Sequence, residues 1–230
     1  MKKLIIILFF GVLCFQPVWS QANCSTFYPM IEGASFEYTN YGKKGKSDGV
    51  TSYTIAKVSN DDGNTSATMV LELSDEKGDE VYSTDYNITC AGDFITIDYK
   101  SLIPGSMLEQ YKDLEMNVSG TDLELPNNLT VGQQLADANV AINIKTSGIN
   151  INSSVDMINR KVQRQESITT PAGTFDCYVI YSENNIKASI IKQKFSSRIW
   201  LAEGIGMVKQ ETYNKNGKLT GSTKLTAYSK

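Results

Sequence analysis

The chain has 230 residues, with 22 basic and 25 acidic side chains, a net charge of −3 and no histidine. Binding to nucleic acid or to anionic lipid headgroups needs clustered Lys and Arg, so this mildly acidic balance argues against both. The imidazole of histidine is the usual general base at neutral pH and a common metal ligand. Because the chain has no histidine, Ser-His and Cys-His nucleophile pairs are ruled out. We therefore expect a protein that is not an enzyme and that holds no metal or cofactor.

The first twenty residues have the pattern of a secretory signal peptide. Lys2 and Lys3 precede an apolar run over residues 4–15, and small residues follow at Ser20 and Ala22. A charged start, an apolar middle and small residues at the cleavage site define such a peptide. The apolar run is shorter than the about 20 residues of a membrane span. We expect residues 1–20 to be removed and residues 21–230 to form a single exported domain, periplasmic or extracellular, without a transmembrane segment.

Two hairpin patterns follow in the first half of the chain, over residues 36–58 and 70–90. Each consists of alternating apolar and polar residues, a short polar turn that contains a glycine, and a second alternating run. Alternation with a period of two is typical of a half-buried strand, and a glycine in the turn can adopt positive φ. Both stretches therefore predict antiparallel strand pairs.

A short amphipathic helix is predicted over residues 106–114. Leu108, Tyr111 and Leu114 recur every three residues, and Met107 lies beside them. This spacing places the four side chains on one side of a helix, which would lie against the sheet. We name these four residues, together with Tyr99 upstream, as the candidate ligand-binding residues.

Three more hairpin patterns occupy the second half of the chain. They cover residues 140–157 with a turn at Ser147-Gly148, residues 160–182 with a turn at 170–173, and residues 208–228. Sustained alternation with turns every 8 to 12 residues is the all-β signature. The sequence thus predicts a mainly antiparallel curved sheet or half-open barrel with one short helix packed against it.

Three cysteines remain once Cys14 leaves with the signal peptide. An exported protein meets an oxidising compartment, where a disulfide is stable. Cys177 lies within an alternating strand pattern, in which a small apolar side chain fits the interior. We therefore expect a Cys24–Cys90 disulfide, with another pairing or three free thiols as the alternatives.

Tyrosines are frequent in the predicted strands. Tyrosine favours strands through cross-strand packing, so most of these residues are expected to be structural. A few that line a concave face could bind a lipid or a glycan by stacking. The residues concerned are Tyr38, Tyr41, Tyr53, Tyr82, Tyr86 and Tyr99.

Residues 170–178, with the sequence TPAGTFDCY, resemble the central motif of a TapB-like family of exported bacterial proteins, a domain of unknown function. Further matching motifs in the same order are Cys24 with residues 27–29, residues 126–128, and residues 200–202 with 204–208. The resemblance implies a β-rich fold similar to periplasmic lipoprotein carriers. It implies no activity and no catalytic residues.

Two classes of function fit these expectations. The first is a binding or carrier module of the bacterial envelope, whose concave apolar face, covered by the helix, holds a lipid, an acyl chain or another apolar ligand. The alternative is a structural or adaptor protein that contacts another envelope protein and whose own side chains fill its interior. The partner would be an envelope protein, a lipid or a glycan. An interior cavity of several hundred Å³ favours the carrier, because ligand sites have about that size.

Overall fold

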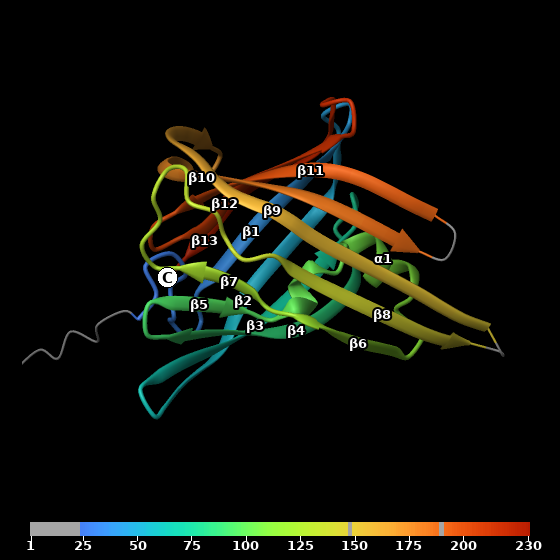
Figure 1. The fold of residues 1–230 in the computed structure, drawn as a ribbon, viewed down its shortest axis with the longest axis horizontal. Coiled ribbons are helices and arrows are strands. Elements are labelled where there is room, and N and C mark those ends of the chain that lie inside the picture. The colour runs from blue at the N-terminus through green and yellow to red at the C-terminus, as the bar shows by residue number, and fades with distance from the viewer. Residues whose placement is uncertain (1–23, 147–148, 189–190) are drawn as a thin grey trace, which may run out of the picture.

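The computed structural model describes residues 24–146, 149–188 and 191–230. Its strands form one antiparallel sheet that curves into a nearly closed barrel (Figure 1). The described strands follow one another around the barrel in the order β6-β8-β9-β10-β11-β12-β13-β1-β2-β3-β4-β5-β7. This confirms the predicted mainly antiparallel sheet.

The bounds of the strands and helices, in chain order, are β1 (Ser35–Gly42), β2 (Ser47–Asp61), β3 (Asn64–Ser74), β4 (Glu80–Ala91), β5 (Phe94–Ile97), η1 (Tyr99–Leu102), α1 (Gly105–Gln110), β6 (Met116–Thr121), β7 (Leu123–Pro126), β8 (Ala138–Thr146), β9 (Ile149–Thr170), β10 (Gly173–Ala188), β11 (Ile191–Ala202), β12 (Gly206–Asn214) and β13 (Leu219–Ser229).

The predicted hairpins form where the polar turns were expected. β1 pairs with β2, β3 with β4, β8 with β9, β9 with β10, and β12 with β13. Gly45 and Gly217 adopt φ values of 73° and 72° in their turns, a region that L side chains rarely adopt. The expected turn at Ser147-Gly148 lies outside the described residues.

The two edges of the sheet meet at a seam, because the edge strands β6 and β7 are separated only by Asp122. Arg160 crosses this seam from β9. Its Nη1 donates hydrogen bonds to the carbonyl oxygens of Glu124 in β7 and of Ala136 before β8. Only 3% of Arg160 is exposed, so these bonds lie in the interior. The arginine therefore ties the two sides of the seam together and closes the barrel.

The N-terminal segment, residues 24–34, closes one end of the barrel beside β5 and β7 (Figure 1, blue). Its Phe27 is buried in the main core. The side-chain amide of Asn127 holds the segment twice, since it donates to the carbonyl oxygen of Cys24 and accepts from the N–H of Thr26. A disulfide joins Cys24 to Cys90. This confirms the predicted pairing, and Cys177 is a buried free thiol.

The helical segment formed by η1 and α1 lies inside the barrel, towards the other end (Figure 1). α1 is shorter than predicted: it ends at Gln110, and the N–H of Tyr111 bonds back to the carbonyl oxygen of Met107. A turn then continues to Leu114, whose N–H bonds to the carbonyl oxygen of Tyr111. The chain must reverse here to reach the edge strand β6, which a longer helix would prevent. Within the described residues, no helix is both long and apolar enough to span a membrane.

Two apolar clusters stabilise the barrel. The main core fills the end that the N-terminal segment closes. The second, here called the α1 cluster, packs the helical segment against β8 and β9, and its buried members are Ile103, Leu108, Val140, Ile142, Ile144 and Val155. Burial of such side chains contributes about 1.5–3 kcal/mol each, which holds the helical segment in place inside the barrel.

Loss of the Cys24–Cys90 disulfide is expected to lower the free energy of unfolding. The bridge spans 66 residues of sequence, and constraint of an unfolded loop of that length stabilises the folded state by up to about 4 kcal/mol. Urea unfolding of a Cys24→Ala/Cys90→Ala double variant should therefore show a lower midpoint than the wild type. A reductant should destabilise the wild type and leave the variant unchanged; equal reductant sensitivity would contradict the role of the bridge.

Replacement of Arg160 by methionine should destabilise the barrel by about 3 kcal/mol. Two buried carbonyl oxygens would lose hydrogen bonds from a charged donor, each worth about 1.5–3 kcal/mol. Arg164→Met serves as the matched control, because Arg164 is exposed and forms a surface ion pair with Glu166, which is worth less than about 1 kcal/mol. Equal destabilisation by both variants, measured in urea, would show that Arg160 does not hold the seam.

Candidate functional site

Two cavities lie inside the barrel, one on each side of the helical segment. The inner cavity has a volume of about 420 Å³ and lies between this segment and the N-terminal segment, bounded by β4, β5, β7 and β9–β12. The mouth cavity has a volume of about 480 Å³ and lies between α1 and β1–β4. Ser101, Ile103 and Gly105 border both cavities. Both volumes fall within the about 300–1,000 Å³ of typical ligand sites.

The inner cavity has one apolar wall and one polar wall. Ile88, Ile97 and Leu123 contribute from β4, β5 and β7. The opposite wall, from β10 to β12, presents Ile186, Phe195 and Ile199. We call it the polar wall because it also carries amide and hydroxyl groups, those of Asn184, Ser197, Gln210 and Thr212. Asn184 Nδ2 donates to Ser197 Oγ at 3.0 Å, which fixes part of this wall. The cavity can therefore receive an apolar ligand that also carries a polar group.

Four tyrosines meet where the N-terminal segment faces the barrel interior, and we call them the tyrosine cluster: Tyr28, Tyr38, Tyr53 and Tyr86. They surround a small third cavity of about 70 Å³. The ring of Tyr53 packs edge-to-face against Tyr38, with centroids 5.6 Å apart, and against Tyr86 at 6.4 Å. Tyr28 and Tyr86 also border the inner cavity, and Tyr53 borders the mouth cavity.

The hydroxyls of the tyrosine cluster stay protonated at neutral pH. Burial raises the pKa of Tyr53 to about 12, and it also raises the pKa of Tyr28, Tyr38 and Tyr86. Each hydroxyl is thus able to donate a hydrogen bond. Tyr38 donates its own to the carbonyl oxygen of Met207 at 2.7 Å.

The five residues predicted to bind a ligand come together around the helical segment. Leu108 is buried in the α1 cluster and borders the mouth cavity. Met107, Tyr111, Leu114 and Tyr99 are partly buried and pack against the same cluster. The backbone N–H of Tyr99 also donates to Asp122 at the seam, at 3.0 Å. These side chains therefore anchor the segment that separates the two cavities.

Sequence reasoning missed the polar wall and the tyrosine cluster as components of one site. Tyr53 shares its strand face with Ile55, and Tyr86 shares its strand face with Ile88. The alternation therefore indicates that both tyrosines point inward, as the two isoleucines do. No short-range pattern indicates that β2, β4 and the N-terminal segment meet at one point. Tyr41, by contrast, lies under Lys224, with the Nζ 5.3 Å from the ring centroid.

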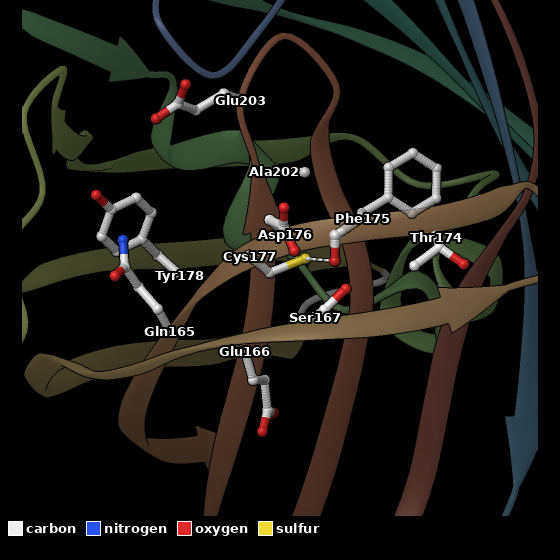
Figure 2. A pocket seen from close by; sticks show the side chains of 10 residues that line it. All are labelled: Gln165, Glu166, Ser167, Thr174, Phe175, Asp176, Cys177, Tyr178, Ala202 and Glu203. Carbon is white, nitrogen blue, oxygen red and sulfur yellow. Dashed lines mark hydrogen bonds between the residues drawn. The ribbon is translucent and has the colours of Figure 1, made fainter.

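A groove of about 620 Å³ lies along β9, β10 and the end of β11 (Figure 2). Glu203 lies at the top of this view and Glu166 at the bottom, and their carboxylates do not point toward each other. The thiol of Cys177 donates to the carbonyl oxygen of Phe175 at 3.4 Å, and burial raises its pKa to about 12. A thiol with so high a pKa is not an activated nucleophile. Among the described residues, no three acidic or cysteine side chains lie close enough together to hold a metal ion.

Comparison with solved structures identifies the fold. An exported-protein structure from Bacteroides fragilis, described as having a YmcC-like fold, superposes with a TM-score of 0.78 at 20% identity, covering 90% of this chain and all of that one. A structure from Parabacteroides distasonis, described as a lipoprotein, gives a TM-score of 0.76 at 23% identity, with 89% and 99% of the two chains covered. The chain thus shares the YmcC-like fold.

A comparison with curated proteins gives no significant match. A match to a family of unknown function covers residues 31–225, which is most of the chain and includes nearly the whole barrel. The chain belongs to the DUF3108-like family.

Proposed function

We propose that this protein is an exported, non-enzymatic carrier of the bacterial envelope that holds an apolar ligand, such as an acyl chain, inside its barrel. The observation that carries the proposal is the inner cavity of about 420 Å³, which the packed side chains leave open. Protein interiors are close-packed, with few voids larger than a water molecule. A cavity of this size inside a nearly closed barrel favours a bound ligand over a self-filled core.

The lining of the cavity supports an apolar ligand. Ile97, Leu123, Val155, Ile186 and Ile199 all border the inner cavity. Removal of apolar ligand surface from water stabilises a complex by about 25 cal/mol for each Å². An acyl chain is the simplest ligand that presents such a surface over its whole length.

Export is supported by two independent observations. The first twenty residues have the pattern of a signal peptide, and the two similar structures are described as an exported protein and a lipoprotein. The proposed site of action is the periplasm or the cell surface.

A side chain that fills the inner cavity should abolish ligand binding. Thr212 borders the cavity from β12, so Thr212→Phe places a ring in it. We expect the apolar fluorophore N-phenyl-1-naphthylamine to bind the wild type and to bind this variant at least tenfold more weakly. Thr169→Phe is the matched control, because Thr169 is exposed on β9, and it should bind like the wild type.

Overpacking can destabilise a protein by about 1–3 kcal/mol, so a second variant separates filling from unfolding. Ser101→Leu extends into the cavity from the helical segment and should give the same loss of fluorophore binding while the circular dichroism spectrum remains unchanged.

Native mass spectrometry of protein purified from its own host should show a bound lipid mass. Bare protein that also fails to bind the fluorophore would contradict the carrier and favour the adaptor with a filled core.

A further inference from the structure

Three hydroxyls of the tyrosine cluster are left without a partner. Tyr38 donates to Met207, but the hydroxyls of Tyr28, Tyr53 and Tyr86 form no hydrogen bond with any residue that the structure describes. Only 9% of Tyr86 is exposed, although its hydroxyl is polar. A hydroxyl that water can reach in the free protein can exchange that water for a ligand oxygen.

These hydroxyls face open space. In the described part of the chain, every side-chain nitrogen or oxygen that is fully shielded from solvent has a hydrogen-bond partner. The three unpartnered hydroxyls must therefore border space that a water molecule can enter. Tyr28 and Tyr86 border the inner cavity. Tyr53 borders two cavities, the small one that the tyrosine cluster surrounds and the mouth cavity.

One buried cation, Arg160, lies near this end of the inner cavity, and the carboxylates of Asp137 and Glu124 offset part of its charge. Arg160 is buried, and its guanidinium is close enough to Tyr28 to lower the pKa of that hydroxyl against the effect of burial. None of the four ion pairs among the described residues includes Arg160. Its pKa is about 10, so it is charged at neutral pH. A positive field favours an electron-rich group and disfavours a cationic one.

The mouth cavity has the opposite character. Asp48, Asp75 and Glu109 border it, so an electron-rich group placed there would meet carboxylates. Asp48 and Glu109 are exposed and Asp75 is half-buried, so solvent screens part of the repulsion that such a group would meet. The two cavities therefore distinguish the two ends of an elongated ligand.

We propose that the ligand is an apolar chain that ends in an oxygen acceptor, a carboxylate or an ester carbonyl, which binds the hydroxyls of Tyr28 and Tyr86 at the inner cavity. This inference rests on the proposed carrier function and specifies the chemistry of its ligand. The acceptor receives hydrogen bonds from these two hydroxyls, and the chain lies along the apolar wall of the inner cavity. The hydrogen bonds select the headgroup, and the cavity selects the chain.

The test compares three probes with the same chain: dodecanoate, methyl dodecanoate and dodecylamine, each measured by displacement of N-phenyl-1-naphthylamine. We expect dodecanoate or its ester to bind at least tenfold more tightly than the amine. Preference for the acid identifies a carboxylate end, and preference for the ester identifies a neutral carbonyl. Equal binding of the amine would overturn the proposal.

Phenylalanine variants show whether the hydroxyls cause this preference. The Tyr28→Phe/Tyr86→Phe double variant removes two unpartnered hydroxyls and no internal hydrogen bond, so it should fold as stably as the wild type. It should lose at least tenfold in affinity for the preferred probe and retain its affinity for dodecylamine. Tyr38→Phe is the matched control: it removes the bond to Met207 and should lower Tm by about 2–4 °C while it leaves probe binding unchanged.

The outcomes separate the two proposals. If no probe displaces the fluorophore, or Thr212→Phe has no effect on binding, the carrier function itself fails. If Thr212→Phe abolishes binding but the double variant binds all three probes like the wild type, the carrier function stands and the headgroup assignment is wrong.

Discussion

The structure depends on closure of the sheet at the seam between β6 and β7. These strands are the two edges of the sheet, and unpaired edges would expose backbone donors and acceptors to other chains. Asp122 alone links them, and Arg160 bonds across to the carbonyl oxygens of Glu124 and Ala136. A charged donor satisfies both acceptors where strand pairing is incomplete. Closure at the seam gives the sheet an interior that is separated from solvent around most of the barrel.

The space inside the barrel is bounded by two segments, the N-terminal segment and the helical segment. The N-terminal segment fills one end with Phe27 and is tied by the Cys24–Cys90 bridge, and the helical segment is anchored by the α1 cluster. Neither segment reaches the other, so space of about 420 Å³ remains between them. Two separate apolar clusters supply the stability, and the rings of the tyrosine cluster belong to the main one while the residues border the cavities.

Local pattern predicts the strands well because each hairpin is a short-range structure. The alternation in residues 36–58 and the glycine turn that follows β1 specify their pairing without any distant contact. The disulfide followed from similar reasoning, since Cys177 fits a strand interior and Cys24 lies outside one. The helix was anticipated from its spacing, but its early end at Gln110 depends on the distant edge strand that the chain must reach.

The candidate site could not be predicted in the same way, because it depends on closure. Tyr28 lies in a segment without alternation, and Tyr53 and Tyr86 look like ordinary core residues of their strands. Arg160 follows Asn159, which has a φ of 53° and interrupts the strand period. Alternation therefore does not predict that the Arg160 side chain points inward. Only the register around the whole barrel brings the three tyrosines to one small cavity and Arg160 near Tyr28.

The most direct measurement is a crystal structure of the full mature chain grown with dodecanoate. The account predicts electron density for an extended chain in the inner cavity, along Ile97 and Leu123, with an oxygen within hydrogen-bond distance of Tyr86 or Tyr28. An inner cavity filled by its own side chains, or ligand density confined to the outer groove beside Cys177, would contradict it.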